Sequence, residues 1–259
     1  MLLGQGALTC ETADVERELK RLAANLSETS VEGSPAQRTA ERLAREDLDV
    51  ASVLEAALNA DTEALRRAAT LRGLDPDAFA KLLELALQPV LWEAAARCAA
   101  LTDIDKWDRG FCPVCGAWPA FAELVGAEKR RVLRCGRCGT WWSWLVLLCP
   151  YCGNDDHRTL GTMTPTADTE RSAPGDAMIS TPRSAGQRVD VCEQCHGYVK
   201  AIATFNVIPT PRIAAEDAAT VHLDIGARDA GYTRPGTVDI ATAGVPRLVR
   251  EGRPLTTGD

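Results

Sequence analysis

The sequence predicts an α+β protein: an N-terminal helical bundle, then two zinc-ribbon-type modules that each contain four cysteines, then a C-terminal helix. Three observations support this class. Residues before about position 106 are rich in Ala, Leu, Glu and Arg, with apolar residues at helical spacing. Four Cys-x-x-Cys pairs follow among short strand-like segments, and a last helical stretch comes after two prolines. We therefore expect a helical domain at 1–106, a first module at 107–161, the completion of the second module at 162–214, and a helix with a tail at 215–259.

The helical part contains two apolar stripes and two breaks. The stripes are Val15, Leu19, Leu22 and Leu26, and then Val50, Val53, Leu54, Ala57 and Leu58. Turn formers at 32–35 and at 72–76 separate the helices, with Asp75 as an N-cap and Pro76 at the first helical position. A long helix is expected from Asp77 to about Leu101, kinked or split at Pro89. Two cysteines, Cys10 and Cys98, have the pattern of small buried apolar residues.

The cysteine-rich part has the composition of short strands. The segments RRVLRC and WWSWLVLLC carry the β-branched and aromatic residues typical of strands. Residues 162–187 are poor in large apolar residues and predict a long loop or a hairpin, whereas 187–205 predict a strand, a cysteine turn and another strand. A final helix is expected over about 215–230, and the tail beyond 232 shows no clear period.

Composition limits the possible partners and the compartment. The net charge of -7 and the pI of about 5.2 argue against a nucleic-acid partner, which requires a basic face. The chain shows neither a secretory signal pattern nor an apolar run long enough to span a membrane. We therefore expect a cytoplasmic protein with no membrane partner, where ten cysteines indicate metal or redox chemistry before disulfides.

The cysteine pairs predict two four-sulfur metal sites. The first candidate set is Cys112, Cys115, Cys135 and Cys138, and the second is Cys149, Cys152, Cys192 and Cys195. Two residues between ligands let the chain turn so that both sulfurs face one ion, and Gly116 and Gly139 supply the backbone angles that such a turn needs. A cross-braced pairing of the four turns remains an alternative. Four thiolates suit zinc or a single iron, and a closed site leaves no position for a substrate.

The order of these motifs resembles the formate dehydrogenase accessory protein family (FdhE). The resemblance rests on FCPVCGAWP, RVLRCGRCGTWW, LCPYCGN and DVCEQCHGYVKAI, and on EDAATVHLDIGARDAGYTRP, which covers residues 216–235. It implies a cytoplasmic maturation factor that is not an enzyme and that binds the catalytic subunit of formate dehydrogenase. It also implies iron in two rubredoxin-like sites formed by the eight cysteines, with zinc as the alternative metal.

Other residues allow a structural and a functional interpretation. The tryptophans at 118, 141, 142 and 144 are expected to shield the sulfurs, with a partner-binding surface as the alternative. The basic residues Lys129, Arg130, Arg131, Arg134 and Arg137 predict a solvated hairpin face more readily than a contact with an acidic partner. His196 could donate to a thiolate or lie exposed, and an active site at His222 and Asp224 is disfavoured because no nucleophile motif accompanies them. Two other function classes stay open: a zinc-ribbon protein that binds nucleic acid or acts in transcription, and a redox or electron-transfer protein.

Overall fold

The chain folds into two compact units, Met1–Ala100 and Leu101–Asp259. The structure is a computed structural model that describes residues 12–46, 48–99, 104–164 and 186–236. The boundary between the units follows Ala100, and the division predicted at 106, 161 and 214 remains a prediction. No helix within the described ranges combines the length and the apolar character needed to cross a membrane.

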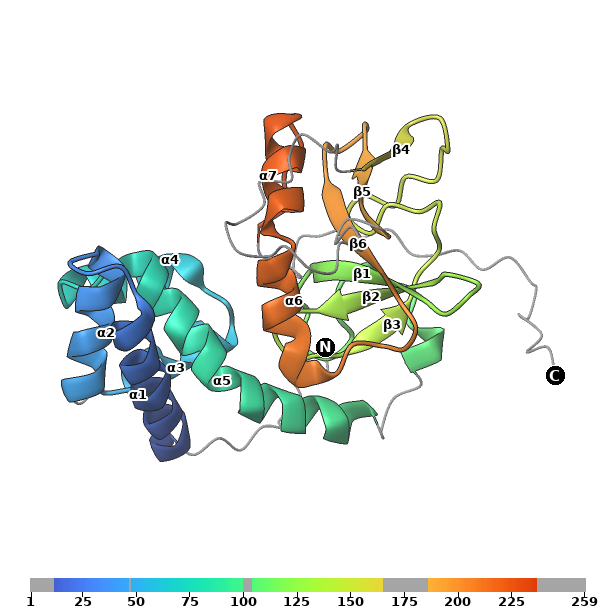
Figure 1. The fold of residues 1–259 in the computed structure, drawn as a ribbon. Coiled ribbons are helices and arrows are strands. Elements are labelled where there is room, and N and C mark those ends of the chain that lie inside the picture. The colour runs from blue at the N-terminus through green and yellow to red at the C-terminus, as the bar shows by residue number, and fades with distance from the viewer. Residues whose placement is uncertain (1–11, 47, 100–103, 165–185, 237–259) are drawn as a thin grey trace, which may run out of the picture. The chain divides into compact units, whose positions relative to one another are not determined.

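The first unit is built from helices (Figure 1). Their bounds are α1 Thr12–Thr29, α2 Pro35–Arg45, α3 Ala51–Leu58, α4 Thr62–Leu71 and α5 Pro76–Ala99. Side-chain caps fix three of the starts, and at α4 Asp61 Oδ1 accepts a hydrogen bond from the amide of Ala64 at 2.9 Å. The Ser34 hydroxyl accepts a hydrogen bond from the amide of Gln37 at 3.1 Å, and Asp75 Oδ1 accepts one from the amide of Ala78 at 2.9 Å. The predicted cap at Asp75 and the helix start at Pro76 are therefore confirmed.

The predicted apolar stripes face the core of this unit only in part. Val15 and Leu19 are buried on α1, whereas Leu22 and Leu26 are half-buried. Helix α5 runs without interruption past Pro89, so the predicted split is wrong. Cys98 near its end is 1% exposed, as expected for a small apolar residue, whereas Cys10 lies outside the described residues.

The second unit contains one six-stranded sheet with the strand order β3-β2-β1-β6-β5-β4. The strands are β1 Pro119–Val125, β2 Arg130–Cys135, β3 Trp141–Ser143, β4 Leu160–Met163, β5 Gln187–Cys192 and β6 Tyr198–Thr204. Each module, taken with its two cysteine turns, contributes three strands: β1 to β3 in the first and β4 to β6 in the second. Within each module the strands pair antiparallel.

A parallel pairing between β1 and β6 joins the two modules into a single sheet. Ala122 pairs with Ala201, and the register continues to Val125 beside Thr204. The repeated module predicted from the cysteine spacing is therefore present, and backbone hydrogen bonds between β1 and β6 join its two copies. Strand β1 was not predicted, because PAFAELV has little β-branched content and its pairing with strands on both sides stabilises it instead.

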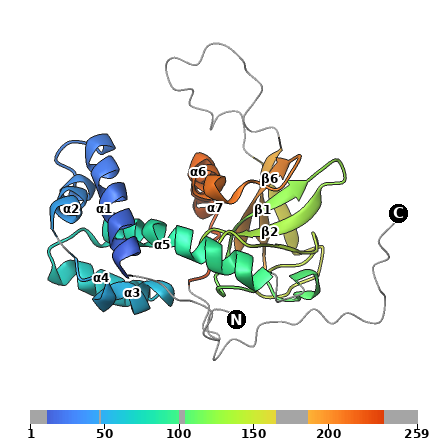
Figure 2. The ribbon, with the colours of Figure 1, turned by 90° about the horizontal axis from the view of Figure 1, so that it is seen from below.

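Two helices, α6 (Ile213–Ala219) and α7 (Val221–Asp229), cover one face of this sheet (Figures 1 and 2). Leu223 and Ala227 of α7 pack in one cluster with Val189 and Val191 of β5. We predicted one continuous helix over 215–230, and this is wrong. The chain breaks at Thr220, where the carbonyl of Asp217 accepts hydrogen bonds from the Thr220 hydroxyl at 3.1 Å and from Lys200 Nζ at 2.9 Å.

The segment WWSWLVLLC does not form the predicted long strand, since only Trp141–Ser143 pairs in the sheet. Beyond the strand, two backbone carbonyl groups accept hydrogen bonds from buried side chains. Arg131 Nη1 donates to the carbonyl of Leu145 at 2.9 Å, and the Trp144 indole donates to that of Leu148 at 2.9 Å. Of the predicted loop or hairpin at 162–187, residues 162–163 belong to β4 and 165–185 lie outside the described residues.

Candidate metal centres

All four Cys-x-x-Cys pairs form the same tight turn. In each, the amide of the first cysteine donates to the carbonyl five residues later: Cys112 to Ala117 at 2.8 Å, Cys135 to Thr140 at 2.9 Å, Cys149 to Asn154 at 2.9 Å and Cys192 to Gly197 at 3.0 Å. The residue after the second cysteine is left-handed in every turn, with φ of 74° at Gly116, 73° at Gly139, 73° at Gly153 and 51° at His196. The role predicted for Gly116 and Gly139 is confirmed. At His196 a residue with a Cβ adopts this conformation, at a cost of about 1–2 kcal/mol.

The eight sulfurs gather into two groups, the first turn with the second and the third with the fourth. In each group the sulfurs lie within 4.8 Å of one another. The Sγ atoms of Cys112 and Cys138 are 3.4 Å apart, as are those of Cys115 and Cys135. In the second group the separations are 3.7 Å between Cys149 and Cys195 and 3.8 Å between Cys152 and Cys192. The described geometry is sequential and not cross-braced.

These distances fit a tetrahedral ion. With metal–sulfur bonds near 2.3 Å, neighbouring sulfurs of a regular tetrahedron stand about 3.8 Å apart. A disulfide would require about 2.05 Å, and all eight cysteines are free. Both groups could therefore each hold one metal ion, and the arrangement does not choose between iron and zinc.

The electrostatics of the groups point the same way. Burial raises the pKa of the Cys112 thiol well above its ordinary value, and burial likewise raises that of Cys149. Hydrogen bonds from the neighbouring cysteines lower the pKa of Cys115, so without a cation the first group would hold protons on some of its thiols and not on all of them. A bound dication favours the four thiolates, which then occupy every position of a tetrahedral shell.

Neighbouring groups donate to or contact individual sulfurs. In the first group, the amide of Cys138 donates to Cys135 Sγ at 3.5 Å, and Thr140 Oγ1 lies 3.1 Å from Cys138 Sγ. In the second, Asn154 Nδ2 donates to Cys192 Sγ at 3.4 Å. Such hydrogen bonds orient the thiolates and disperse their charge. Asn154 was not predicted, although its place directly after CPYCG was the available signal.

The tryptophans mostly take the structural role expected of them. Trp142 is fully buried and Trp144 is 6% exposed. Trp118 packs edge-on against Phe111 and Tyr151, with ring centroids 6.2 and 5.2 Å away. Trp141 is the most exposed of the four, with the guanidinium of Arg130 5.6 Å from its ring centroid.

The predicted solvated basic face is wrong for two of its residues. Arg131 and Arg134 are 4% and 1% exposed. Arg131 pairs with Asp190 Oδ2 at 3.1 Å, and Arg134 donates to the carbonyl of Ile208 at 2.6 Å while lying 3.6 Å from Glu123 Oε1. These arginines fasten distant segments to the sheet, so their charges are not available to an external partner.

A second set of polar residues, which the sequence did not reveal, lies between β6 and the helices. Lys200 is fully buried, and its Nζ lies 2.6 Å from Asp217 Oδ1 and 2.7 Å from Asp224 Oδ2. Tyr198 donates to Asp224 Oδ1 at 2.8 Å, and Arg234 Nη2 reaches the same oxygen at 2.9 Å. We call Lys200, Asp217, Asp224 and Arg234 the ionic cluster. It gives Asp224 a structural role, in line with the disfavoured active-site reading.

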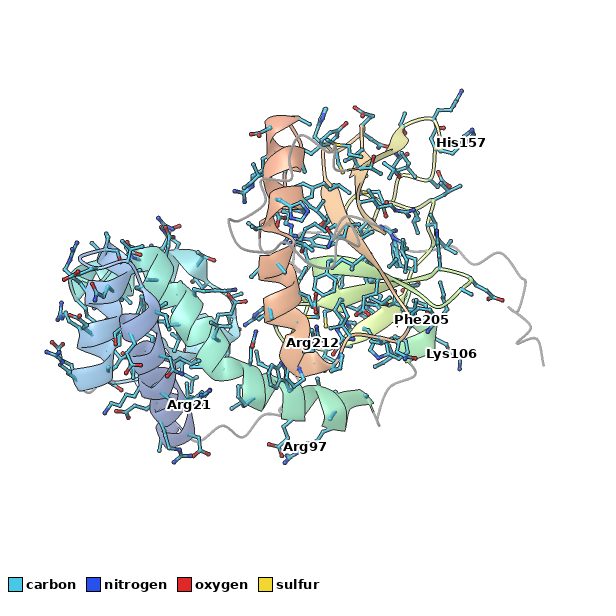
Figure 3. All side chains as sticks on the ribbon, in the orientation of Figure 1. Arg21, Arg97, Lys106, His157, Phe205 and Arg212 are labelled. Atoms are coloured by element: carbon cyan, nitrogen blue, oxygen red, sulfur yellow. The ribbon has the colours of Figure 1, made fainter. Side chains whose placement is uncertain are left out.

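Among the described residues, no histidine side chain forms a hydrogen bond to a sulfur, although His196 belongs to the fourth cysteine turn. His157 is exposed and points away from the sheet (Figure 3). His196 is exposed at the fourth turn, with its ring 6.2 Å from that of Tyr232, and the carbonyl of His196 accepts a hydrogen bond from the amide of Thr233 at 2.7 Å. His222 is half-buried on α7.

Comparisons with known proteins give a consistent set of relatives. No family model matches the chain. The chain is 27% identical over 166 residues to an FdhE homologue of Aquifex aeolicus, covering 62% of this chain and 52% of the relative. It is 30% identical over 118 residues to an FdhE homologue of Shewanella baltica, covering 45% of this chain and 33% of the relative. The chain therefore spans about half or less of the length of these relatives.

A solved structure shares the fold. The crystal structure of the FdhE protein from Pseudomonas aeruginosa matches with a TM-score of 0.53 at 20% sequence identity. The match covers 88% of this chain and 73% of that protein. At this identity the likeness shows the fold alone.

Proposed function

We propose that the chain is a member of the FdhE family and a cytoplasmic accessory factor for the maturation of formate dehydrogenase, a proposal that its likeness to FdhE homologues supports. In this role it binds the catalytic subunit of that enzyme and catalyses no reaction itself. The observation that carries the proposal is the pair of four-sulfur groups within one shared sheet. A scaffold of this kind presents a fixed surface to a client.

We assign the metal ligands as two sets. Cys112, Cys115, Cys135 and Cys138 hold one ion, and Cys149, Cys152, Cys192 and Cys195 hold the other. Iron is the metal that the family resemblance favours, and zinc is the alternative. Iron would supply one-electron chemistry when bound, whereas the four thiolates leave no coordination position for a substrate. The residues of the chain serve to orient the sulfurs, exclude water and hold the strands together.

Association with the catalytic subunit tests the proposal. The full chain, purified without oxygen and assayed for metal, is mixed with the isolated catalytic subunit and captured by a tag. We expect retention of the subunit and about two ions per chain, one for each sulfur group. A strain that lacks the protein should show reduced formate oxidation. The proposal fails if the subunit is not retained and the strain oxidises formate normally.

Matched cysteine variants separate a role of the sites from a general effect of losing a thiol. Cys135→Ser removes a ligand of the first group, and Cys192→Ser removes the corresponding ligand of the second. Cys98→Ala removes a buried thiol from the helical unit, outside both groups. Loss of subunit binding in the two site variants, with binding kept in Cys98→Ala, would show that the interaction needs the metal-stabilised second unit, as proposed. Equal binding by all three would show that the metal sites do not serve the interaction.

A further inference from the structure

The two sulfur groups differ in their access to solvent. In the first group Cys112 and Cys135 are fully buried, Cys138 is 1% exposed and Cys115 is 9% exposed. In the second group Cys149 and Cys192 are buried, but Cys152 and Cys195 are both partly exposed. The same turn geometry is therefore sealed in one module and open to solvent in the other.

Close packing explains the sealing of the first group. A Cβ on Gly139, in its second turn, would stand 2.3 Å from Thr210 Cγ2, so the loop after β6 lies directly on this turn. A Cβ on Gly110, just before the first turn, would stand 1.8 Å from the carbonyl oxygen of Pro150. No side chain and no water fits at either contact. The approach that remains to this group is at Cys115, which is 9% exposed.

A cavity reaches the second group instead. It has a volume of about 450 Å³, counting the part open to solvent, and Cys149 and Cys192 form part of its wall. Arg131, Arg188 and Asp190 line it from the sheet side, and Val146 and Leu147 line it from the connecting loop. Since Cys152 and Cys195 are partly exposed, the second group can be approached at these two sulfurs, and the cavity lies against the two residues that carry the others.

The fourth turn also holds a short segment that closes the fold, Gly231–Arg234, which we call the strap. The amide of Thr233 donates to the carbonyl of His196 at 2.7 Å, and the amide of Tyr198 donates to the carbonyl of Thr233 at 3.2 Å. The Tyr232 hydroxyl donates to Glu193, which lies between the two cysteines of that turn. The backbone position of the strap therefore depends on the conformation of residues 192–197.

The strap in turn completes the ionic cluster. Arg234 Nη2 contacts Asp224 at 2.9 Å and donates to the carbonyl of Ala120 on β1 at 2.7 Å, while its guanidinium lies 5.4 Å from the centroid of the Tyr198 ring. One side chain at the end of the strap thus links the second module, α7 and the first module. Displacement of the strap would remove a cation from beside the partly buried carboxylates of Asp217 and Asp224.

We infer that the second group is an exchangeable metal site whose ion holds the strap in place, whereas the first group is a permanent structural site. This inference rests on the proposed function only in taking both groups as metal sites. Exchange proceeds by ligand substitution: an incoming chelating ligand binds the ion as each thiolate leaves and takes up a proton from water. The fourth turn then loses its restraint, and the strap is released.

The kinetics of metal release test whether the second group exchanges its ion faster than the first. The full chain is loaded with zinc, and a colour-forming chelator is added in excess. We expect one ion to leave roughly tenfold faster or more than the other, because two cysteines of the second group are partly exposed whereas no cysteine of the first exceeds 9%. Iodoacetamide followed by peptide mass spectrometry should modify Cys152 and Cys195 before Cys115 and Cys135. Release of both ions at one rate, with equal alkylation of the two groups, would overturn the inference.

Hydrogen exchange tests whether the ion of the second group holds the strap in place. After release of the fast ion, we expect the amides of Tyr198 and Thr233 to lose protection, because their acceptors lie in the strap and in the fourth turn. The amides paired between β1 and β2 should stay protected. Retained protection at Thr233 would show that the strap does not depend on the metal.

Matched ligand variants keep the test decisive. Cys152→Ser should bind one ion tightly and show a released strap, whereas Cys115→Ser, at the corresponding place in the first group, should lose the structure of the first module. A strap released equally in both variants contradicts the inference. Failure to bind the formate dehydrogenase subunit would leave these results unchanged, so the proposed partner and this inference fail separately.

Discussion

Replacing Lys200 by methionine should strongly destabilise the second unit. The Nζ atom is fully buried, lies within 2.7 Å of two carboxylates and donates to the carbonyl of Asp217 at 2.9 Å. Methionine keeps the apolar stem, so little cavity forms, but the carboxylates lose their shared cation. Removing one partner of a buried ion pair costs about 3–5 kcal/mol. Arg234 stays beside Asp224, and the Asp217 side chain is 34% exposed, so we expect a value near the lower limit.

Urea unfolding of the metal-loaded full chain, followed by tryptophan fluorescence, measures this loss. Of the six tryptophans only Trp92 lies in the first unit, so the signal reports mainly on the second. Arg212→Met is the matched control, since it also removes a cation beside a carboxylate in the same unit. Its pair with Glu216 lies at the surface, with the Arg212 side chain 68% exposed (Figure 3), and should contribute about 0.5 kcal/mol or less.

A double-mutant cycle identifies the cause. Asp217→Asn should cost less in the Lys200→Met background than in the native protein, because the cation that pairs with Asp217 is already absent. The reasoning is refuted if Lys200→Met is no more destabilising than Arg212→Met. Additive effects of Lys200→Met and Asp217→Asn would refute the assignment to this ion pair.

Three further predictions concern separate parts of the chain. Cys135→Ser should lose the first ion and unfold the second unit, since metal binding contributes on the order of 10 kcal/mol to the folding of small sites of this kind. The helical circular dichroism signal from the first unit should persist. Equal melting temperatures of the apo and metal-loaded native protein would contradict this. Leu19→Ala, at a side chain 1% exposed, should destabilise the helical unit by about 2–5 kcal/mol and leave metal content unchanged, as metal analysis beside thermal unfolding can check. Ser34→Ala should cost that unit about 1 kcal/mol in urea unfolding by loss of the cap on α2, and Ser34→Asp should restore most of it.

The parts of the fold that depend on local chemistry were predictable from the sequence. The cysteine turns need two intervening residues and a left-handed position, and the helix start at Pro76 needs only its cap, so each is encoded within a few residues. The burial of Arg131 and Arg134 was not predictable. Their partners include Asp190 and the carbonyl of Ile208, which lie far along the chain and meet the arginines only after the sheet has formed.

The pairing of the cysteine turns, the break between α6 and α7 and the length of β3 likewise depend on contacts that local sequence does not encode. Cysteine spacing alone permits a sequential or a crossed arrangement, and the strand order decides between them. The interruption at Thr220 coincides with side-chain hydrogen bonds to the carbonyl of Asp217, which apolar periodicity does not register. The shortened strand after Trp141 likewise depends on a buried guanidinium that captures the loop carbonyl of Leu145.

The parallel contact between β1 and β6 has a consequence for any attempt to divide the protein. A fragment that ends before the third cysteine turn would retain one complete set of four sulfurs. In that fragment β1 would become an exposed edge strand with unpaired backbone amide and carbonyl groups. Such edges recruit strands from other chains, so the fragment would tend to self-associate and precipitate. Each module of the cysteine-rich unit thus covers a strand edge of the other that would otherwise promote aggregation.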